Sequence, residues 1–81
     1  MSNVNAPKGF ILVTQIAEDA MSAPCLIPVS KICGVQDVTG IDQLSIPAGA
    51  KSVFMMDVEN AAPCFITEDL NTVAILIGKA L

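Results

Sequence analysis

The sequence predicts an α+β fold: a small antiparallel sheet of about five to six strands, strongly bent or closed into a partial barrel, with one C-terminal helix. Short runs of β-branched and aromatic residues alternate with turn residues through most of the chain, and a helical pattern follows only near its end. Of the 81 residues, 53% are hydrophobic and 15% are charged, which is typical of a compact domain. A chain of this length has room for one core.

The chain divides into an arm and a domain. Residues 1–8 are polar, contain Pro7 and show no periodicity, which predicts a flexible N-terminal arm. Residues 9–81 are expected to form a single α+β domain. Its first strand, residues 10–16, carries apolar residues on both faces, so we expect both faces to be covered.

Three further extended segments are expected before the middle of the chain, at residues 24–29, at 33–38 and, more weakly, at 41–46. Pro28 indicates that the first of these is an edge strand or bends, because proline cannot donate to a central ladder. The weak segment leads into residues 47–50, where a proline followed two positions later by a glycine predicts a turn.

Residues 52–59 alternate between two faces, as a strand with one core face does. Asp57 and Glu59 fall on one face together with Val53 and Met55. The opposite face is the expected core face, formed by Phe54, Met56 and Val58.

The end of the chain predicts a short strand at residues 64–66 and a helix at 70–80. Thr67 is the expected N-cap of this helix. Glu68 and Asp69 place negative charge at the positive end of the helix dipole, which supports a helix start at this point.

The helix is apolar over an unusually wide arc, and this predicts self-association. At 100° per residue, Ile75 points to the polar side, and with Leu76 it leaves apolar surface without a partner in so short a chain. We therefore expect a homo-oligomer, a dimer or higher, in which Ile75, Leu76, Ile11 and Val13 contribute to the interface. The apolar side expected to face the core consists of Leu70, Val73, Ala74, Leu76, Ile77, Ala80 and Leu81.

Several residue types are missing, and their absence excludes whole classes of function. The chain has no His, Trp or Tyr, its cations are four separate lysines, and its formal net charge is −4. Imidazole catalysis and imidazole metal sites are excluded, and a nucleic-acid surface is disfavoured because phosphate binding needs clustered cations. No phosphate-binding glycine motif occurs either. From these absences together, we expect no catalytic residue, no metal and no cofactor.

The cysteines and the N-terminal region indicate a reduced, soluble protein. Cys25, Cys33 and Cys64 are an odd number without metal-site spacing, which favours buried thiols over a disulfide framework or a metal site. The beginning of the sequence lacks an export signal, and no apolar run approaches the length of a membrane span. We expect a cytoplasmic protein without a membrane partner.

One five-residue pattern occurs twice. Residues 23–27 and 62–66 share the pattern Ala-Pro-Cys-apolar-Ile, at a spacing of 39 residues, and each follows a strand-like run and an acidic turn. Either each half of the chain is one hairpin of an internal repeat, or the apolar composition produced the pattern by chance. Cys25 and Cys64 occupy matched positions and are expected to approach each other, but no nearby cation favours a redox role.

The order of these segments resembles small β proteins of the flagellar-protein-D type and their phage-borne relatives. The resemblance is carried by residues 11–14, 25–32 and 64–73, fewer than half of the positions. It implies a barrel-like or half-barrel sheet with one helix and no enzymatic activity.

Two kinds of function remain open. The first is a non-enzymatic, self-associating binding or structural module with a groove at the subunit interface, for which Thr14, Gln15, Asp57 and Glu59 are the expected polar lining. This lining suits a neutral or cationic ligand, either a small molecule or a protein. The alternative is a phage or mobile-element accessory protein that sequesters a small ligand or blocks a host protein.

An enzyme is disfavoured. Its only basis is that Asp57 and Glu59, on one face of a strand, would have backbones about 6–7 Å apart and could share acid and base roles. Such pairs more often lie on a solvated face.

Overall fold

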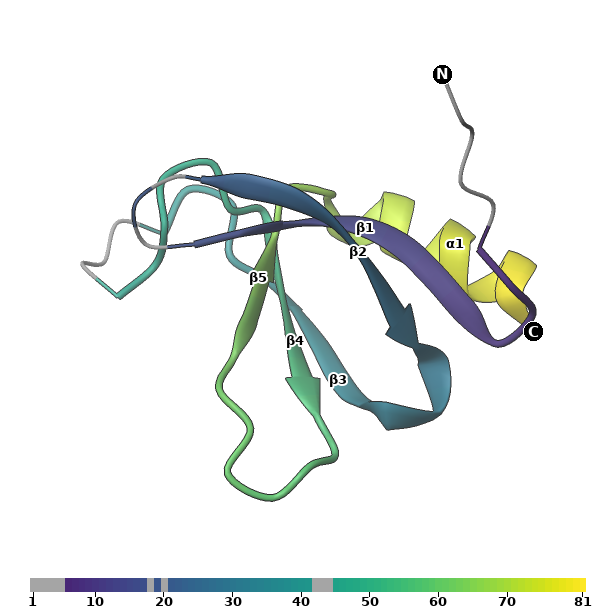
Figure 1. The fold of residues 1–81 in the computed structure, drawn as a ribbon. Coiled ribbons are helices and arrows are strands. Elements are labelled where there is room, and N and C mark those ends of the chain that lie inside the picture. Colours follow the sequence, from purple (N-terminus) through teal and green to yellow (C-terminus); the bar gives the residue numbers. More distant parts are fainter. Residues whose placement is uncertain (1–5, 18, 20, 42–44) are drawn as a thin grey trace.

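The computed structural model describes residues 6–17, 19, 21–41 and 45–81. Five strands form one antiparallel sheet in the order β2-β1-β5-β4-β3, and a helix ends the chain (Figure 1). The elements are β1 (Phe10–Ile16), β2 (Ser22–Pro28), the 3₁₀ turn η1 (Val29–Lys31), β3 (Ile32–Asp37), β4 (Ser52–Met56), β5 (Cys64–Ile66) and α1 (Leu70–Ala80). The predicted α+β class, with one bent antiparallel sheet and one C-terminal helix, is confirmed.

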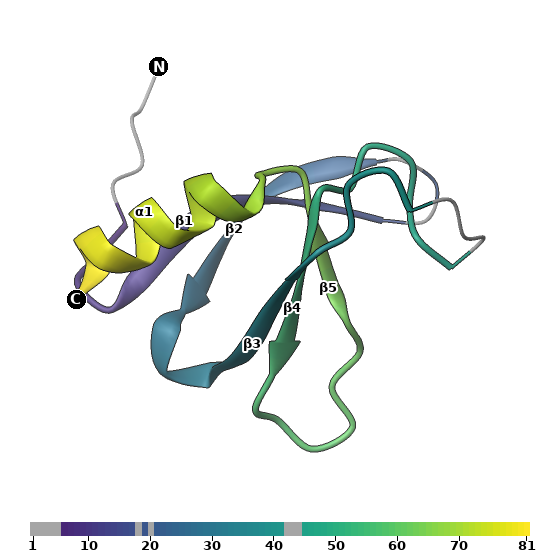
Figure 2. The ribbon, with the colours of Figure 1, turned by 180° about the vertical axis from the view of Figure 1, so that it is seen from behind.

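The sheet is strongly bent because its two edge strands are consecutive in the chain. β2 and β3 lie at opposite edges of the sheet, yet only the three residues of η1 connect them. Figures 1 and 2 show the β1–β2 hairpin crossing β3, β4 and β5 at a steep angle, with α1 lying along β1. The sheet therefore has a concave inner side and a convex outer side.

The core fills the concave side. Phe54 and Ile66 are fully buried, and Ile11 and Val13 of β1 pack in the same cluster at 1% exposure. α1 contributes the buried Val73, and three half-buried residues of the helix pack against the cluster at helical spacing: Leu76, Ile77 and Ala80.

The helix buries a narrower side than expected. Leu70 is 42% exposed and Leu81 is 79% exposed, so the prediction that both face the core is wrong. Leu70 opens the first turn and Leu81 is the C-cap, so both project past the ends of the contact with the sheet. Ala74 is exposed as well.

The start of α1 also differs from the prediction. The carboxylate of Asp69 accepts a hydrogen bond from the Thr72 amide at 2.8 Å, so Asp69 is the N-cap in place of Thr67. Thr67 instead donates its amide to the carbonyl of Thr14 at 3.0 Å, which extends the contact between β1 and β5. The hydrogen bonds from Thr72 lower the pKa of Asp69.

β4 ends three residues earlier than the alternation predicts. Val58 is 56% exposed and lies beyond the end of the strand at Met56, so it is not a core residue. At the other end of β4, Ser52 is fully buried and donates its hydroxyl to the carbonyl of Glu68 at 2.8 Å. The register of residues 52–56 follows the predicted alternation.

The other boundaries are close to those expected. The predicted strand at 10–16 and the helix at 70–80 have the observed bounds, and the strands predicted at 24–29 and 33–38 are displaced by one or two residues. Ile41, Ser45 and Ile46 are not in a strand, and residues 42–44 of the weaker predicted segment lie outside the described residues.

The two Ala-Pro-Cys segments lie on either side of β1. One belongs to β2 and the other leads into β5, and both strands pair antiparallel with β1. A shift of 39 residues along the sequence places the β1–β2 hairpin over the β4–β5 hairpin. Cys25 pairs with Val13, so an exact repeat would pair Cys64 with Ser52. Cys64 pairs with Phe54 instead, and the register of the second hairpin therefore differs by two residues. Two hairpins are present, and whether they share ancestry stays open.

The cysteines differ in exposure, and all three are free thiols. Cys64 is buried, Cys25 is half-buried against the same core cluster, and Cys33 is exposed. Burial raises the pKa of the Cys64 thiol, and the neighbouring Cys25 raises it further. Cys64 and Cys25 therefore behave as small core residues, and the expectation that Cys33 is buried as well is wrong.

Candidate functional site

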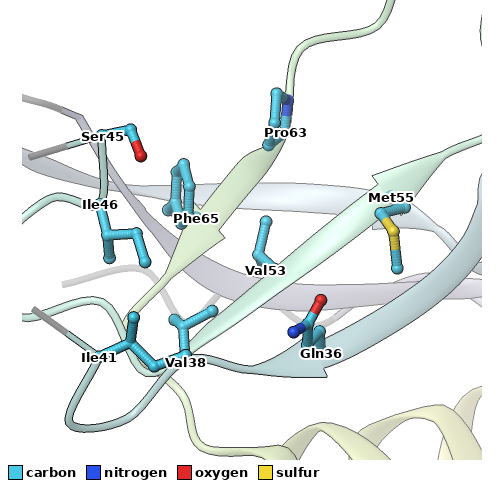
Figure 3. Close-up of a pocket in the computed structure, with 9 residues that line it drawn as sticks. All are labelled: Gln36, Val38, Ile41, Ser45, Ile46, Val53, Met55, Pro63 and Phe65. Atoms are coloured by element: carbon cyan, nitrogen blue, oxygen red, sulfur yellow. The ribbon is translucent and has the colours of Figure 1, made fainter. Parts of the chain in front are cut away.

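A hollow of about 300 Å³ lies on the convex side of the sheet, over β3, β4 and β5. Figure 3 shows its lining side chains, which come from these three strands, from the connection between β3 and β4 and, for Pro63, from the connection between β4 and β5. Nine residues line it: Gln36, Val38, Ile41, Ser45, Ile46, Val53, Met55, Pro63 and Phe65.

The floor of the hollow is set by strand register. Val53 of β4 pairs with Gln36 of β3 on one side and with Phe65 of β5 on the other, so these three side chains form one row across the sheet. Alternation along β4 sends Phe54 into the core and Val53 to the opposite side. Val53 is nonetheless only 7% exposed, because the connection between β3 and β4 covers it.

The walls of the hollow come from the β3–β4 connection and from the ends of the strands. Val38 is 5% exposed and anchors the connection, since its amide donates to the Lys51 carbonyl at 2.9 Å. Ile41 and Met55 are 41% and 48% exposed and form part of the rim. An apolar side chain of another molecule would find apolar contacts on several sides.

The chemistry of the hollow is apolar and uncharged. Seven of its nine lining residues are apolar, and the other two are Gln36 and Ser45. Figure 3 shows these two polar side chains at opposite sides of the hollow. A glutamine amide donates and accepts hydrogen bonds, and a serine hydroxyl does both, so each can orient a neutral polar group beside an apolar one.

A second hollow of about 430 Å³ adjoins the first one. It shares Ser45, Pro63 and Phe65 with the first and extends to Gln15 and Ile16 of β1. Phe65 therefore separates two shallow hollows on the same side of the sheet.

The polar residues predicted to line one groove are separated in the structure. Gln15 lines the second hollow, beside the Ser52 end of β4, because Gln15 and Ser52 both pair with Ile66. Asp57 and Glu59 are exposed beyond the other end of β4. Five residues of a strand span about 17 Å, so these residues do not line one groove within a single chain.

Thr14 is engaged inside the fold and does not line either hollow. Its amide donates to both carboxylate oxygens of Glu68, at 2.9 and 3.0 Å, and its carbonyl accepts from Thr67.

The prediction that Asp57 and Glu59 lie on one face of a strand is also wrong, because both residues lie in the turn after β4.

The residues predicted to form an interface have different environments. Ile11 and Val13 are each 1% exposed in the core of a single chain and cannot contact a second copy. Ile75 is 50% exposed, whereas Leu76 is half-buried against the core. The prediction assigned the burial of Ile11 and Val13 to a second copy because the sequence alone does not show which element covers each face of β1.

The described residues contain no group of three His, Cys, Asp or Glu side chains placed to hold a metal ion. None of the helical segments in the described part of the chain has the length and apolar character that a bilayer-spanning helix needs.

Sequence reasoning missed the hollow, although part of its signal was present. The alternation in residues 52–59 placed Val53 and Met55 on the second face of β4. Their neighbours Gln36 and Phe65 could be found only from the strand order, which the sequence did not provide. Comparison with known proteins found no matching family model, no matching curated protein and no matching solved structure.

Proposed function

We propose that this chain is a small, non-enzymatic, self-associating binding module that takes up an uncharged apolar group in the hollow over β3, β4 and β5. The observation that carries the proposal is the composition of this hollow, which has seven apolar residues and two neutral polar ones. Transfer of an apolar group from water to such walls is favourable. A charged ligand would lose hydration there without gaining a counter-charge.

The size of the hollow limits the ligand. Small-molecule pockets usually enclose about 300–1,000 Å³, so a hollow of about 300 Å³ is at the lower end of that range. It suits one bulky side chain of a partner or the apolar part of a small molecule.

Binding without catalysis fits the lining better than an enzymatic reaction does. Ser45 supplies the only hydroxyl among the nine lining residues, and none of the nine can serve as a general base. Asp57 and Glu59, the acid pair on which the disfavoured enzymatic interpretation depended, do not line the hollow.

Self-association is supported by the apolar surface outside the hollow. Leu70, Ile75 and Leu81 of the helix region are 42%, 50% and 79% exposed, and Leu26 on β2 is 40% exposed. A chain with few charges that leaves this much apolar surface in water gains free energy when a second copy covers part of it.

A neutral apolar dye tests the binding part of the proposal. N-phenyl-1-naphthylamine should bind the wild-type protein saturably, with an increase in fluorescence that the chain itself does not obscure, since it contains no Trp or Tyr. Met55→Lys places a charge at the rim, and we expect it to weaken dye binding by about fivefold or more. Val58→Lys is the matched control, because Val58 is similarly exposed and lies outside the hollow.

Either of two results would overturn the binding proposal. One is a fluorescence increase that does not saturate, and the other is equal weakening by the two lysine substitutions. Native mass spectrometry of the untagged protein tests self-association separately.

A further inference from the structure

A third hollow, of about 370 Å³, lies between the start of β1 and the last turns of α1. The Gly9 amide donates to the Ala80 carbonyl at 3.1 Å and fastens these two segments to each other. Of the nine described residues that line the hollow, seven are apolar and the other two are Lys8 and Lys79. This hollow therefore differs in chemistry from the one over β3, β4 and β5.

The charge of the third hollow is positive. Two of the four lysines of the chain line it, and no acidic residue occurs among its described lining residues. The chain as a whole carries a net charge of −4, so the hollow is a local exception. Lys8 and Lys79 are both exposed, so an anion can approach their ammonium groups without burying either charge.

The edge of β1 that faces away from β2 has a free backbone donor at this hollow. The Phe10 amide donates to the Pro7 carbonyl at 3.0 Å, and the Thr14 amide donates to Glu68. The Leu12 amide lies between these two amides and points the same way, because alternate residues of a strand share a direction. Among the described residues, the structure gives the Leu12 amide no hydrogen-bond partner, and Leu12 lines the hollow.

The helix forms the facing wall of the hollow. Figure 2 shows α1 lying along β1. Leu76 and Lys79 both line the hollow and are three residues apart, so they lie on one face of the helix. Leu76 is half-buried against the core, whereas Lys79 is exposed. An apolar group in contact with Leu76 would therefore lie one helical turn from an ammonium group.

We propose that this hollow binds a small molecule that joins one carboxylate to an apolar chain, as a medium-chain fatty acid does. The carboxylate accepts a hydrogen bond from the Leu12 amide and is attracted by the ammonium groups of Lys8 and Lys79. The apolar chain packs against Phe10 and Leu76. The site is independent of the proposed function, because the two hollows have no lining residue in common.

The charges around the hollow favour an anion over a cation. The carboxylate of Glu68 is held by the Thr14 amide, which is two residues, or about 7 Å, along β1 from the Leu12 amide. This charge opposes a second carboxylate, as does the partial negative charge of about one half at the C-terminal end of α1. The two lysines outweigh both, whereas a cationic ligand would meet two like charges.

Titration with octanoate tests the inference. Octanoate carries one carboxylate on an apolar chain, and octanol has a chain of the same length without a charge. In proton–nitrogen NMR correlation spectra, octanoate should shift the Leu12 amide resonance saturably. It should bind at least about threefold more tightly than octanol, because only octanoate interacts with the two exposed cations.

Substitutions separate the contributions of the charges. Lys8→Gln and Lys79→Gln should each weaken octanoate binding by about twofold to fivefold and leave octanol binding unchanged. Glu68→Gln keeps an acceptor for the Thr14 amide and removes the neighbouring negative charge, so it should tighten octanoate binding. Lys51→Gln is the matched control, because Lys51 is exposed, lies outside the hollow and loses the same charge.

Four results would overturn the inference. A shift of the Leu12 amide that is absent or does not saturate would show that the hollow has no site. Equal affinities for octanoate and octanol would remove the role of the carboxylate, and equal weakening by the substitutions of Lys8, Lys79 and Lys51 would show only an effect of net charge. Saturable shifts at Val53 in place of Leu12 would place octanoate in the hollow over β3, β4 and β5.

Discussion

The hydrogen bond between Glu68 and β1 gives a prediction with a calculable size. β1 pairs with β5 only at Gln15, so the Thr14 amide has no strand partner on that side and uses the Glu68 carboxylate instead. Glu68→Ala removes this acceptor from a half-buried amide. The fold should survive, because the rest of the sheet and the core are unchanged, but it should be less stable.

The magnitude follows from counting one bond. The two oxygens lie 2.9 and 3.0 Å from the same nitrogen, so they share one donor and count once. A hydrogen bond to a charged group contributes about 1.5–3 kcal/mol, and partial exposure favours the lower end. We expect Glu68→Ala to lower the free energy of unfolding by about 1–2 kcal/mol, and Glu68→Gln, which keeps one acceptor, to lower it by less.

Urea denaturation followed by far-UV circular dichroism measures the effect. Each kcal/mol also corresponds to roughly 4–8 °C in melting temperature for a domain of this size. Glu59→Ala is the control, because Glu59 is exposed in a turn. Hydrogen exchange at the Thr14 amide should become faster in Glu68→Ala. Equal losses of stability in the Glu68 and Glu59 variants would show that the hydrogen bond to Thr14 does not stabilise the fold.

Three further predictions concern other parts of the fold. Gly49 has a φ of +92°, and a methyl group added to its Cα would lie 3.3 Å from the Ile16 side chain, so Gly49→Ala should destabilise the protein by about 1 kcal/mol or more. Gly78 is helical with open space around it, so Gly78→Ala should stabilise the protein by about 0.5–1 kcal/mol. Thermal unfolding measures both changes. Cys33 is exposed, whereas burial raises the pKa of the Cys64 thiol, so a thiol reagent at neutral pH should label Cys33 first, and Cys33→Ser should abolish the fast phase. Hydrogen bonds at the N-cap lower the pKa of Asp69 below its usual value of 3.8, so the unfolded chain binds the proton of this carboxyl group more tightly than the folded chain does. The contribution of Asp69 to stability is therefore present above about pH 3.8 and is lost as the pH falls through the folded pKa. Asp69→Asn should flatten that part of the profile of unfolding free energy against pH.

Local patterns in the sequence predicted individual elements well. A run rich in β-branched residues located β1, and the acidic residues before Leu70 located the start of α1. Each of these signals depends on neighbours along the chain, so no knowledge of the tertiary structure was needed. The N-cap was misassigned because Thr67, a good capping residue, is used by the contact with β1.

The candidate site was harder to predict because it depends on strand order. Gln36, Val53 and Phe65 are far apart in the sequence and form one row only through two antiparallel registers. Ile11 and Val13 illustrate the same limit. Their apolar pattern predicted burial, but only the position of β1 between β2 and β5, with α1 alongside, decides that the burial occurs within one chain.

The short link between β2 and β3 explains why the two sides of the sheet differ. Three residues in a 3₁₀ turn advance about 6 Å, whereas the edges of a flat sheet of five strands lie about 19 Å apart. The sheet must therefore bend until its edges approach each other at the Pro28 end, and β2 is an edge strand, as its proline indicated. Bending makes the concave side small enough for α1 to complete the core, and it spreads the side chains on the convex side. The β3–β4 connection covers Val53 there but leaves Met55 and Ile41 exposed, and so the hollow is a consequence of the same link that closes the core.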